Sequence, residues 1–206
     1  MHCPSIFREE RLDVLHGLIT AHPLATLITA GSSGLMANLI PFTLHSGGEH
    51  GILRAHLARG NKQLDALREA AEALVVFQGP ECYVTPSWYP SKSEHGKVVP
   101  TWNYAVVQVR GKPLVIDDAA WVQAQIAQLT ANLEDGRDRP WKVSDAPEDF
   151  IAAQLKAIVG VEIPVLSIEG KWKVSQNRLA QDRQGVINGL RAERACPEML
   201  EMMERG

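Results

Sequence analysis

The stretch GPECYVTPSWYPSKSEHGKVVPTWNYAVVQV, residues 79–109, is the one around which we expect the rest of the chain to be organised. It contains all three tyrosines and two of the five tryptophans of the chain: Tyr83, Trp88, Tyr89, Trp102 and Tyr104. These rings have polar tips that need hydrogen-bond partners when they are buried. The set is typical of the wall of a pocket for a flat ligand. An aromatic corner of a β-barrel core is the alternative interpretation.

The middle of this stretch has the composition of a loop. Pro86, Pro90 and Pro100 bracket the run SKSEHGKVV (91–99), which contains Gly96 and charges of both signs. Such a composition predicts an ordered turn and a mobile loop between two strands. We therefore expect the run to act as a lid.

The composition of the whole chain is that of an ordinary globular protein. The 206 residues are 45% hydrophobic and 22% charged, with a net charge of −3, so nucleic acid would need a local basic patch. We expect a soluble protein, because no apolar run is long enough for a membrane span. Charges near the start exclude an export signal, and three widely spaced cysteines indicate a reducing cytoplasm.

Outward from this stretch, the periodicity of the sequence predicts short strands and small helices. Helices are expected at 7–21, 58–72, 117–133 and 147–158, and strands at 24–30, 35–44, 52–57, 73–77, 83–85, 102–110, 112–116 and 159–170. Because the strands do not alternate regularly with helices, the pattern favours an antiparallel barrel. We expect a single domain over 1–206, mainly β with α, with a helical insertion at about 117–158 and a helical C-terminal tail at about 178–206.

The first chemical candidate is the turn in ILRAHLARGNKQL (52–64). A strand carries His56, the chain turns at Ala58 and Arg59, and a helix begins near Asn61 and Lys62. A helix start with free N–H groups and basic side chains favours an anion such as phosphate. The alternative is an Asn-capped surface helix with solvated charges.

The second candidate is GKWKVSQNR (170–178), whose polar residues are suited to the edge of a heteroaromatic ring or to a phosphate: Lys171, Lys173, Gln176, Asn177 and Arg178. A basic surface turn is the alternative. Residues 171–194 contain six basic and two acidic residues, so a DNA or RNA patch is conceivable, although a mixed solvated face is the simpler interpretation.

Other motifs are absent from the sequence. The histidines do not have metal-ligand spacing, and there is no GxGxxG, GxxxxGKS/T or GxSxG motif. Cys82 is interpreted as a buried structural thiol. His56 and His95 are candidates for proton transfer, or ordinary structural histidines. No catalytic residue and no metal site is assigned.

Four short motifs in order carry a resemblance to a known family: HLARGN, YVTPSWY with VPTWNYAVV, GKWKVSQNR and GVINGL. Together they resemble the FMN-binding negative transcriptional regulators of the PaiB type. That family is similar to the flavin-binding split barrels, which include pyridoxamine phosphate oxidase. The resemblance covers the whole chain and implies an antiparallel split β-barrel with peripheral helices, and FMN held by a homodimer.

The resemblance also implies roles for particular residues. Ala58, Arg59, Asn61 and Lys62 would form the phosphate turn, and His56 would face the cofactor. The pocket and the ring system of FMN would be contacted by Ser87, Trp88, Tyr89, Thr101, Trp102, Asn103, Lys171, Gln176 and Asn177. At this turn the chain reads Arg-Gly-Asn-Lys, whereas Asn-Pro is common in the family. The family pattern therefore does not itself assign a role to Lys62.

The resemblance leaves several functions open. The first is an FMN-binding homodimer, either a flavin-dependent oxidoreductase that uses NAD(P)H or another small-molecule substrate, or a flavin-sensing regulator. The second is a negative transcriptional regulator that acts through DNA or a protein partner without flavin redox chemistry; the net charge disfavours direct DNA binding. A haem-handling split barrel is the third.

Overall fold

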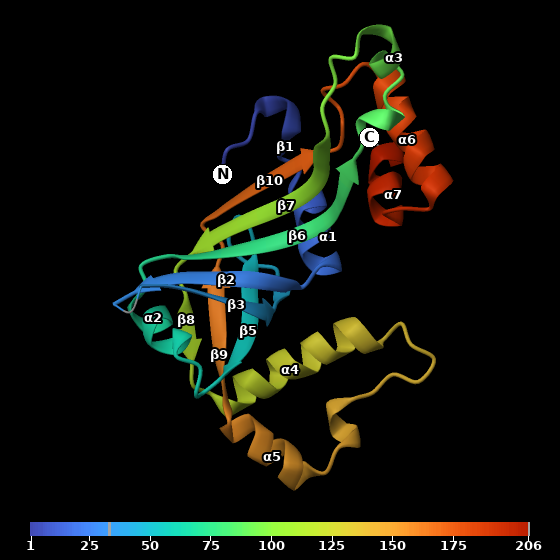
Figure 1. Cartoon of the computed structure of the whole chain (residues 1–206). Coiled ribbons are helices and arrows are strands. Elements are labelled where there is room, and N and C mark those ends of the chain that lie inside the picture. Colours follow the sequence, from blue (N-terminus) through green and yellow to red (C-terminus); the bar gives the residue numbers. More distant parts are fainter. Residues whose placement is uncertain (33, 206) are drawn as a thin grey trace. The chain divides into compact units, whose positions relative to one another are not determined.

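The computed structural model describes residues 1–32 and 34–205, and these residues divide into two compact units. Unit 1 comprises residues 1–18, 78–107 and 169–206, and unit 2 comprises residues 19–77 and 108–168. Two long strands, β6 (Ala73–Val84) and β7 (Thr101–Gly111), each run from one unit into the other (Figure 1). Nothing in this division tests the single-domain prediction, which stays a prediction.

Unit 1 is built on strands that follow one another in the order β1, β10, β7, β6. In this unit lie η1 (Ser5–Phe7), β1 (Arg8–Glu9), most of α1 (Leu12–Ala21), η2 (Pro86–Trp88), α3 (Ser91–His95), most of β10 (Ser167–Lys173), α6 (Ala180–Glu193) and α7 (Pro197–Arg205). One side of the sheet packs against α1, because the glycine positions there leave room for leucines. A Cβ at Gly79 would lie 2.7 Å from Cδ1 of Leu18, and one at Gly170 would lie 2.2 Å from Cδ2 of Leu15.

Helices α6 and α7 lie side by side at the end of unit 1 (Figure 1). They enclose a cluster of buried side chains that includes Val186, Leu190, Met199 and Met203, all fully buried. The helical C-terminal stretch therefore does not extend into solvent, because its apolar side chains complete a core of their own.

Unit 2 contains two antiparallel runs of strands, in the orders β6, β2, β3 and β4, β5, β9, β8. Its elements are β2 (Leu24–Gly31), β3 (Gly34–Pro41), β4 (Thr43–His45), β5 (Ile52–Ala58), α2 (Gln63–Glu69), β8 (Leu114–Ile116), α4 (Ala119–Glu134), η3 (Val143–Asp145), α5 (Glu148–Lys156) and β9 (Ile158–Pro164). Leu27, Leu53, Val75, Phe77 and Val161 are completely buried and form its core. Phe42 and Phe77 meet edge to face, 5.9 Å apart.

Local chemistry explains where the helices of unit 2 begin. The carboxylate of Asp118 accepts a hydrogen bond from the Trp121 N–H at 2.9 Å and caps α4. Asn61 Oδ1 accepts from the Gln63 N–H at 2.9 Å at the start of α2. Trp121 then lies over Gly160 of β9, where a Cβ would come within 2.3 Å of the ring, so α4 covers the strands.

The prediction of separate strands at 73–77 and 83–85 was wrong, because β6 is continuous from Ala73 to Val84. Phe77 and Gly79 are buried at alternate positions, and then Cys82 and Val84 are buried after a shift of one residue. Such a shift is typical of a β-bulge, which a proline tolerates because it has no N–H to pair. Pro80 therefore displaces the strand by one position without ending it.

The fold is α+β with antiparallel sheets, which confirms the predicted class. The region expected to form the helical insertion holds α4, η3 and α5, while residues 159–170 are divided between β9 and β10. Over residues 1–32 and 34–205, no helix is both long and apolar enough to cross a membrane.

Candidate functional site

The unit 1 sheet carries an exposed face of aromatic and basic side chains, which we call the ring–lysine face: Tyr83, Trp102, Tyr104, Lys171 and Lys173. These side chains share one face because successive side chains on a strand alternate between the two faces of a sheet. On β7, Asn103, Ala105 and Val107 are buried, so Trp102 and Tyr104 point the other way. Tyr83 and Trp102 are 48% and 51% exposed, and their rings meet edge to face at 5.9 Å. Two large rings thus remain open to a ligand.

The two lysines of this face contact β7. Lys171 Nζ is 5.2 Å from the centre of the Tyr104 ring and donates to the carbonyl of His2 at 3.1 Å. Lys173 Nζ donates to Thr101 Oγ1 and to the carbonyl of Trp102. Burial lowers the pKa of Lys173, and the positive charges of Arg178 and Lys171 lower it further. This face therefore combines aromatic surface with concentrated positive charge, which is suited to a planar anion.

The opposite face of the same sheet holds the other predicted ring contacts. Asn103 is 1% exposed, and its Nδ2 donates to Ser175 Oγ at 2.9 Å and lies 3.5 Å from Met203 Sδ. Tyr89 is 2% exposed in the α6–α7 cluster, under the Arg178 guanidinium at 4.8 Å. Burial raises the pKa of Tyr89, and within the described residues its hydroxyl has no hydrogen-bond partner.

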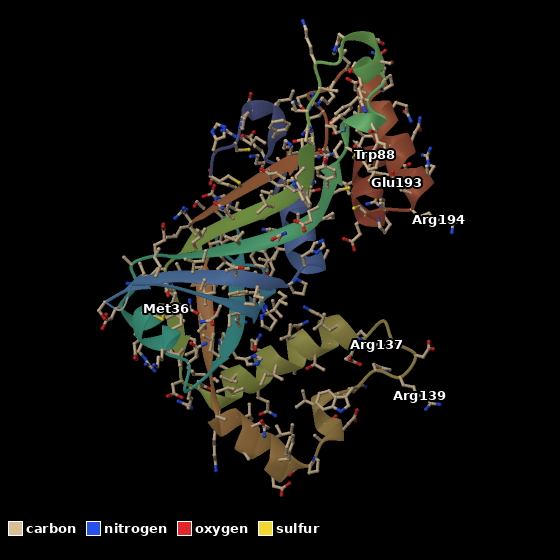
Figure 2. All side chains as sticks on the ribbon, viewed as in Figure 1. Met36, Trp88, Arg137, Arg139, Glu193 and Arg194 are labelled. Carbon is tan, nitrogen blue, oxygen red and sulfur yellow. The ribbon has the colours of Figure 1, made fainter. Side chains whose placement is uncertain are left out.

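Trp88 is held against α6 by two glycines of the GVINGL segment. A Cβ at Gly185 would lie 2.0 Å from the Trp88 carbonyl oxygen, and one at Gly189 would lie 2.5 Å from the indole ring. The indole N–H donates to Glu193 Oε1 at 3.1 Å, and Figure 2 shows the two side chains together at α6. The glycines are needed because the segment 86–90 packs directly on the helix backbone.

The first half of the predicted lid is anchored to α6. Residues 86–88 and 91–95 form η2 and α3. The buried carboxylate of Asp182 on α6 accepts from Ser91 Oγ at 2.7 Å and from the Ser91 N–H at 3.1 Å. Within 91–100 the run from Gly96 to Pro100 lacks regular secondary structure, so the ordered turn predicted here is the helix α3, and the mobile loop and its role as a lid stay predictions.

The remaining predicted residues of unit 1 lie near its surface. Ser87 is exposed and its Oγ accepts from Lys92 Nζ at 3.2 Å. Gln176 bridges Val174 N–H and the Trp172 carbonyl, so it stabilises the turn after β10. Asn177 is exposed.

The predicted phosphate turn lies in unit 2, where Arg59 is already paired. Its guanidinium makes a two-pronged contact with the carboxylate of Asp117, with Nη1 to Oδ2 at 2.8 Å, and its Nε donates to the Lys156 carbonyl at 2.8 Å. The ion pair lowers the pKa of Asp117 and raises that of Arg59. Arg59 therefore joins the end of β5 to β8 and to the end of α5.

The other residues of this turn differ in their surroundings. Ala58 and Lys62 are exposed, while Asn61 caps α2. His56 Nδ1 lies 2.7 Å from Oε1 of Gln125 on α4, whose buried Nε2 has no partner among the described residues. His56 therefore faces α4.

Several functional contacts could not be found from sequence patterns. Sequence patterns did not indicate Asp117 as a partner of Arg59, and Gln63, which is fully buried, was not singled out. Gln63 Nε2 donates to the Leu27 carbonyl at 2.9 Å, while its Oε1 accepts from Asn38 Nδ2 at 2.8 Å. The only available signal was a polar residue on the apolar side of a short helix. None of the described residues forms a group of three or more His, Cys, Asp or Glu that could hold a metal ion.

Comparison with known sequences identifies a family. The model of the family described as "Putative FMN-binding domain" matches residues 1–167. The protease synthase and sporulation protein PAI 2 of Bacillus subtilis is 28% identical, over 99% of this chain and 97% of that protein. An uncharacterized protein of Emericella nidulans is 37% identical, over 92% of this chain and 90% of that protein. The resemblance to the PaiB type is thereby confirmed.

Solved structures share the fold at low sequence identity. The flavocytochrome Anf3 from Azotobacter vinelandii has a TM-score of 0.57 and 14% identity, over 81% of this chain and 69% of that chain. The FAD and heme binding protein from Mycobacterium smegmatis has a TM-score of 0.57 and 20% identity, over 81% of this chain and 73% of that chain. The split-barrel architecture is thereby confirmed, and the predicted site residues stay predictions.

Proposed function

The chain belongs to the FMN-binding family whose model it matches, and on this premise we propose that it binds FMN on the ring–lysine face and acts as a homodimeric flavin-dependent oxidoreductase. The observation that carries the proposal is the exposed Tyr83 and Trp102 pair beside Lys171 and Lys173. An isoalloxazine ring needs aromatic cover and polar partners at its edge, and this face offers both.

The chain's own residues have separate parts in this proposal. Trp102 and Tyr83 cover the ring system, and the lysines attract the negative charge of the cofactor. Bound FMN supplies the hydride or electron transfer to a small-molecule substrate such as NAD(P)H. The turn of Ala58, Arg59, Asn61 and Lys62 in unit 2 stays a separate prediction of a phosphate contact, supported by the exposed Lys62 as a point charge.

A titration of the purified protein with FMN, followed by quenching of flavin fluorescence, tests binding. Trp102→Ala should weaken the affinity about tenfold, because one aromatic stacking contact is worth about 0.5–1.5 kcal/mol beyond the area it buries. Trp141→Ala is the matched control, because Trp141 is 45% exposed but lies in the helical region of unit 2. If both variants and the parent bind FMN with equal affinity, FMN does not bind on the ring–lysine face. In a separate titration with haem, a Soret band would favour haem as the ligand.

The homodimer is supported by an uncovered apolar face of unit 2. Its β2, β3 and β6 side chains that point away from the core are uncharged: Leu24, Thr26, Ile28, Ala30, Leu35, Ala37, Leu39, Leu74 and Val76. Leu35 is 80% exposed and Leu39 is 65% exposed. An apolar sheet face of this kind marks an interface in soluble proteins, and a second copy of the chain is the occupant that the family resemblance implies.

The mass of the protein in solution tests the dimer. Leu39→Asp should convert it to a monomer, because a buried unpaired carboxylate opposes association. Leu166→Asp is the control, because Leu166 is 66% exposed but lies after β9, outside this face. A parent protein that is monomeric at all concentrations would overturn this part of the proposal.

The basic residues of 171–194 favour the redox role over direct DNA binding. Arg178 lies over the Tyr89 ring, Arg183 donates to the Met203 carbonyl, and Arg191 pairs with Glu204 at 2.5 Å. Three of the six basic side chains of this segment are thus engaged within unit 1, which weakens the case for a continuous basic patch that binds DNA phosphates. Oxidation of NAD(P)H by the FMN-loaded protein should exceed that of free FMN. A salt-sensitive shift of promoter DNA without such oxidation would favour the regulator instead.

A further inference from the structure

Two cysteines that lie far apart in sequence belong to the same buried region of unit 1. Cys82 on β6 is 3% exposed and belongs to the buried cluster under α6 and α7, and the partly buried Cys196 packs against the same cluster. Cys82 Sγ also lies 3.2 Å from the Tyr83 carbonyl. Sequence patterns indicate no partner for Cys82, because Cys196 stands more than a hundred residues later and comes to the same cluster only through the packing of α6 and α7.

The surroundings of the two thiols differ. Burial and the adjacent Cys196 thiol raise the pKa of Cys82 to about 12, so Cys82 stays protonated at neutral pH. Cys196 stands immediately before Pro197, the first residue of α7, and its carbonyl accepts the Leu200 N–H at 3.0 Å. Cys196 is partly exposed, whereas Cys82 is buried, so an oxidant in solution reaches Cys196 first.

The chain around Cys196 is held in an unusual backbone conformation. Arg194 and Cys196 have φ values of 52° and 45°, in the region that residues other than glycine seldom adopt. The bend turns the chain between α6 and α7, and Figure 2 shows Arg194 at this bend, next to Glu193. The bend directs Cys196 to the cluster that contains Cys82, and such backbone is typical of functional positions.

We propose that Cys196 and Cys82 are an oxidisable pair that a hydroperoxide converts to a disulfide. The Cys196 thiolate attacks the peroxide, the O–O bond breaks, and Cys196 becomes a sulfenic acid while hydroxide leaves and takes a proton to form water. The Cys82 sulfur then attacks Cys196 Sγ, the S–O bond breaks, and water leaves as the S–S bond forms. In total two thiols lose two protons and two electrons, and hydrogen peroxide is reduced to two molecules of water.

The disulfide connects β6 to the bend between α6 and α7. Tyr83 of the ring–lysine face follows Cys82 directly, so oxidation fixes the strand that carries this ring. The reaction itself does not depend on bound flavin, and its test is independent of the proposed function.

The experiment uses the Cys3→Ser protein, because Cys3 lies elsewhere, with its Sγ 3.7 Å from the Gly170 carbonyl. After exposure to hydrogen peroxide, intact mass spectrometry should show the loss of two hydrogen masses, and both remaining thiols should resist alkylation in denaturant until a dithiol is added. The protein should remain of unchanged size in non-reducing electrophoresis.

Two variants in the same background assign the roles. Cys82→Ser should accumulate a sulfenic acid at Cys196 that dimedone traps, and Cys196→Ser should leave Cys82 reduced; circular dichroism confirms that each variant is folded. The proposal is overturned if both thiols of the Cys3→Ser protein still alkylate fully after peroxide treatment, or if oxidation yields only bridges between chains.

Discussion

The two faces of the unit 1 sheet use the same residue types for different purposes. Trp102 is 51% exposed beside Lys173, whereas Tyr89 is 2% exposed in the α6–α7 cluster. Both come from the aromatic stretch at 79–109. Alternation along β7 leaves Trp102 exposed, whereas Tyr89 follows η2 and packs in the cluster that contains Cys82 and Val84. An aromatic-rich segment therefore supplies an exposed aromatic surface and part of a core at once. The pocket and core interpretations of this stretch each describe one face.

The largest expected effect is on the buried face. Tyr89→Ala should lower the free energy of unfolding by about 3–5 kcal/mol, because it removes a large ring from a close-packed cluster. Trp102→Ala should lower it by less than about 1 kcal/mol, because half of that side chain is already exposed. Urea unfolding of both variants measures the difference. Equal losses would mean that the two faces do not differ.

Substitution of the glycines under Trp88 should have the next largest effect. Gly185→Ala should lower the free energy of unfolding by about 1–3 kcal/mol, because the new Cβ meets the Trp88 backbone carbonyl, which cannot move aside. Gly17→Ala on α1 is the matched control, since a Cβ there meets nothing within 4 Å. The control should be neutral or more stable by up to about 1 kcal/mol. If Gly185→Ala unfolds like the parent, the segment 86–90 does not pack on α6 as described.

On the exposed face, Lys173 should make stability depend on pH. Its pKa is lowered from the ordinary value of 10.5, chiefly by burial, so the unfolded chain binds more protons than the folded one just below pH 10.5. Stability from this group therefore rises with pH through the window between the lowered folded pKa and 10.5. Lys173→Met should remove that rise in chemical unfolding at a series of alkaline pH values. If the free energy of unfolding depends on pH in the same way in the parent and in Lys173→Met, the rise does not come from Lys173.

The smallest expected effect is that of Tyr89→Phe. The Tyr89 hydroxyl is buried and has no partner among the described residues, so its removal should change the free energy of unfolding by no more than about 0.5 kcal/mol. Together with Tyr89→Ala, this variant separates the ring from its hydroxyl. A loss above about 1 kcal/mol would reveal a hydrogen bond such as one through water.

Much of the local structure was predictable from the sequence. The β2–β3 hairpin, the strand with His56, and α4 with its cap at Asp118 all follow from apolar periodicity and turn residues. The break expected between 77 and 83 was wrong because pairing with neighbouring strands outweighs a single proline. The first helix begins at Leu12 rather than residue 7, because Arg8 and Glu9 pair with β10.

The sequence by itself determined the residue types of the candidate site, and the order of its motifs determined the family. Only the tertiary structure decided which side chains meet: Arg59 with Asp117, Trp88 with Gly189, and Cys82 with Cys196. The physical reason is that periodicity and turn preference act over a few neighbouring residues, whereas these contacts join residues that are dozens of positions or more apart. Such contacts arise only when burial of apolar surface brings distant segments together.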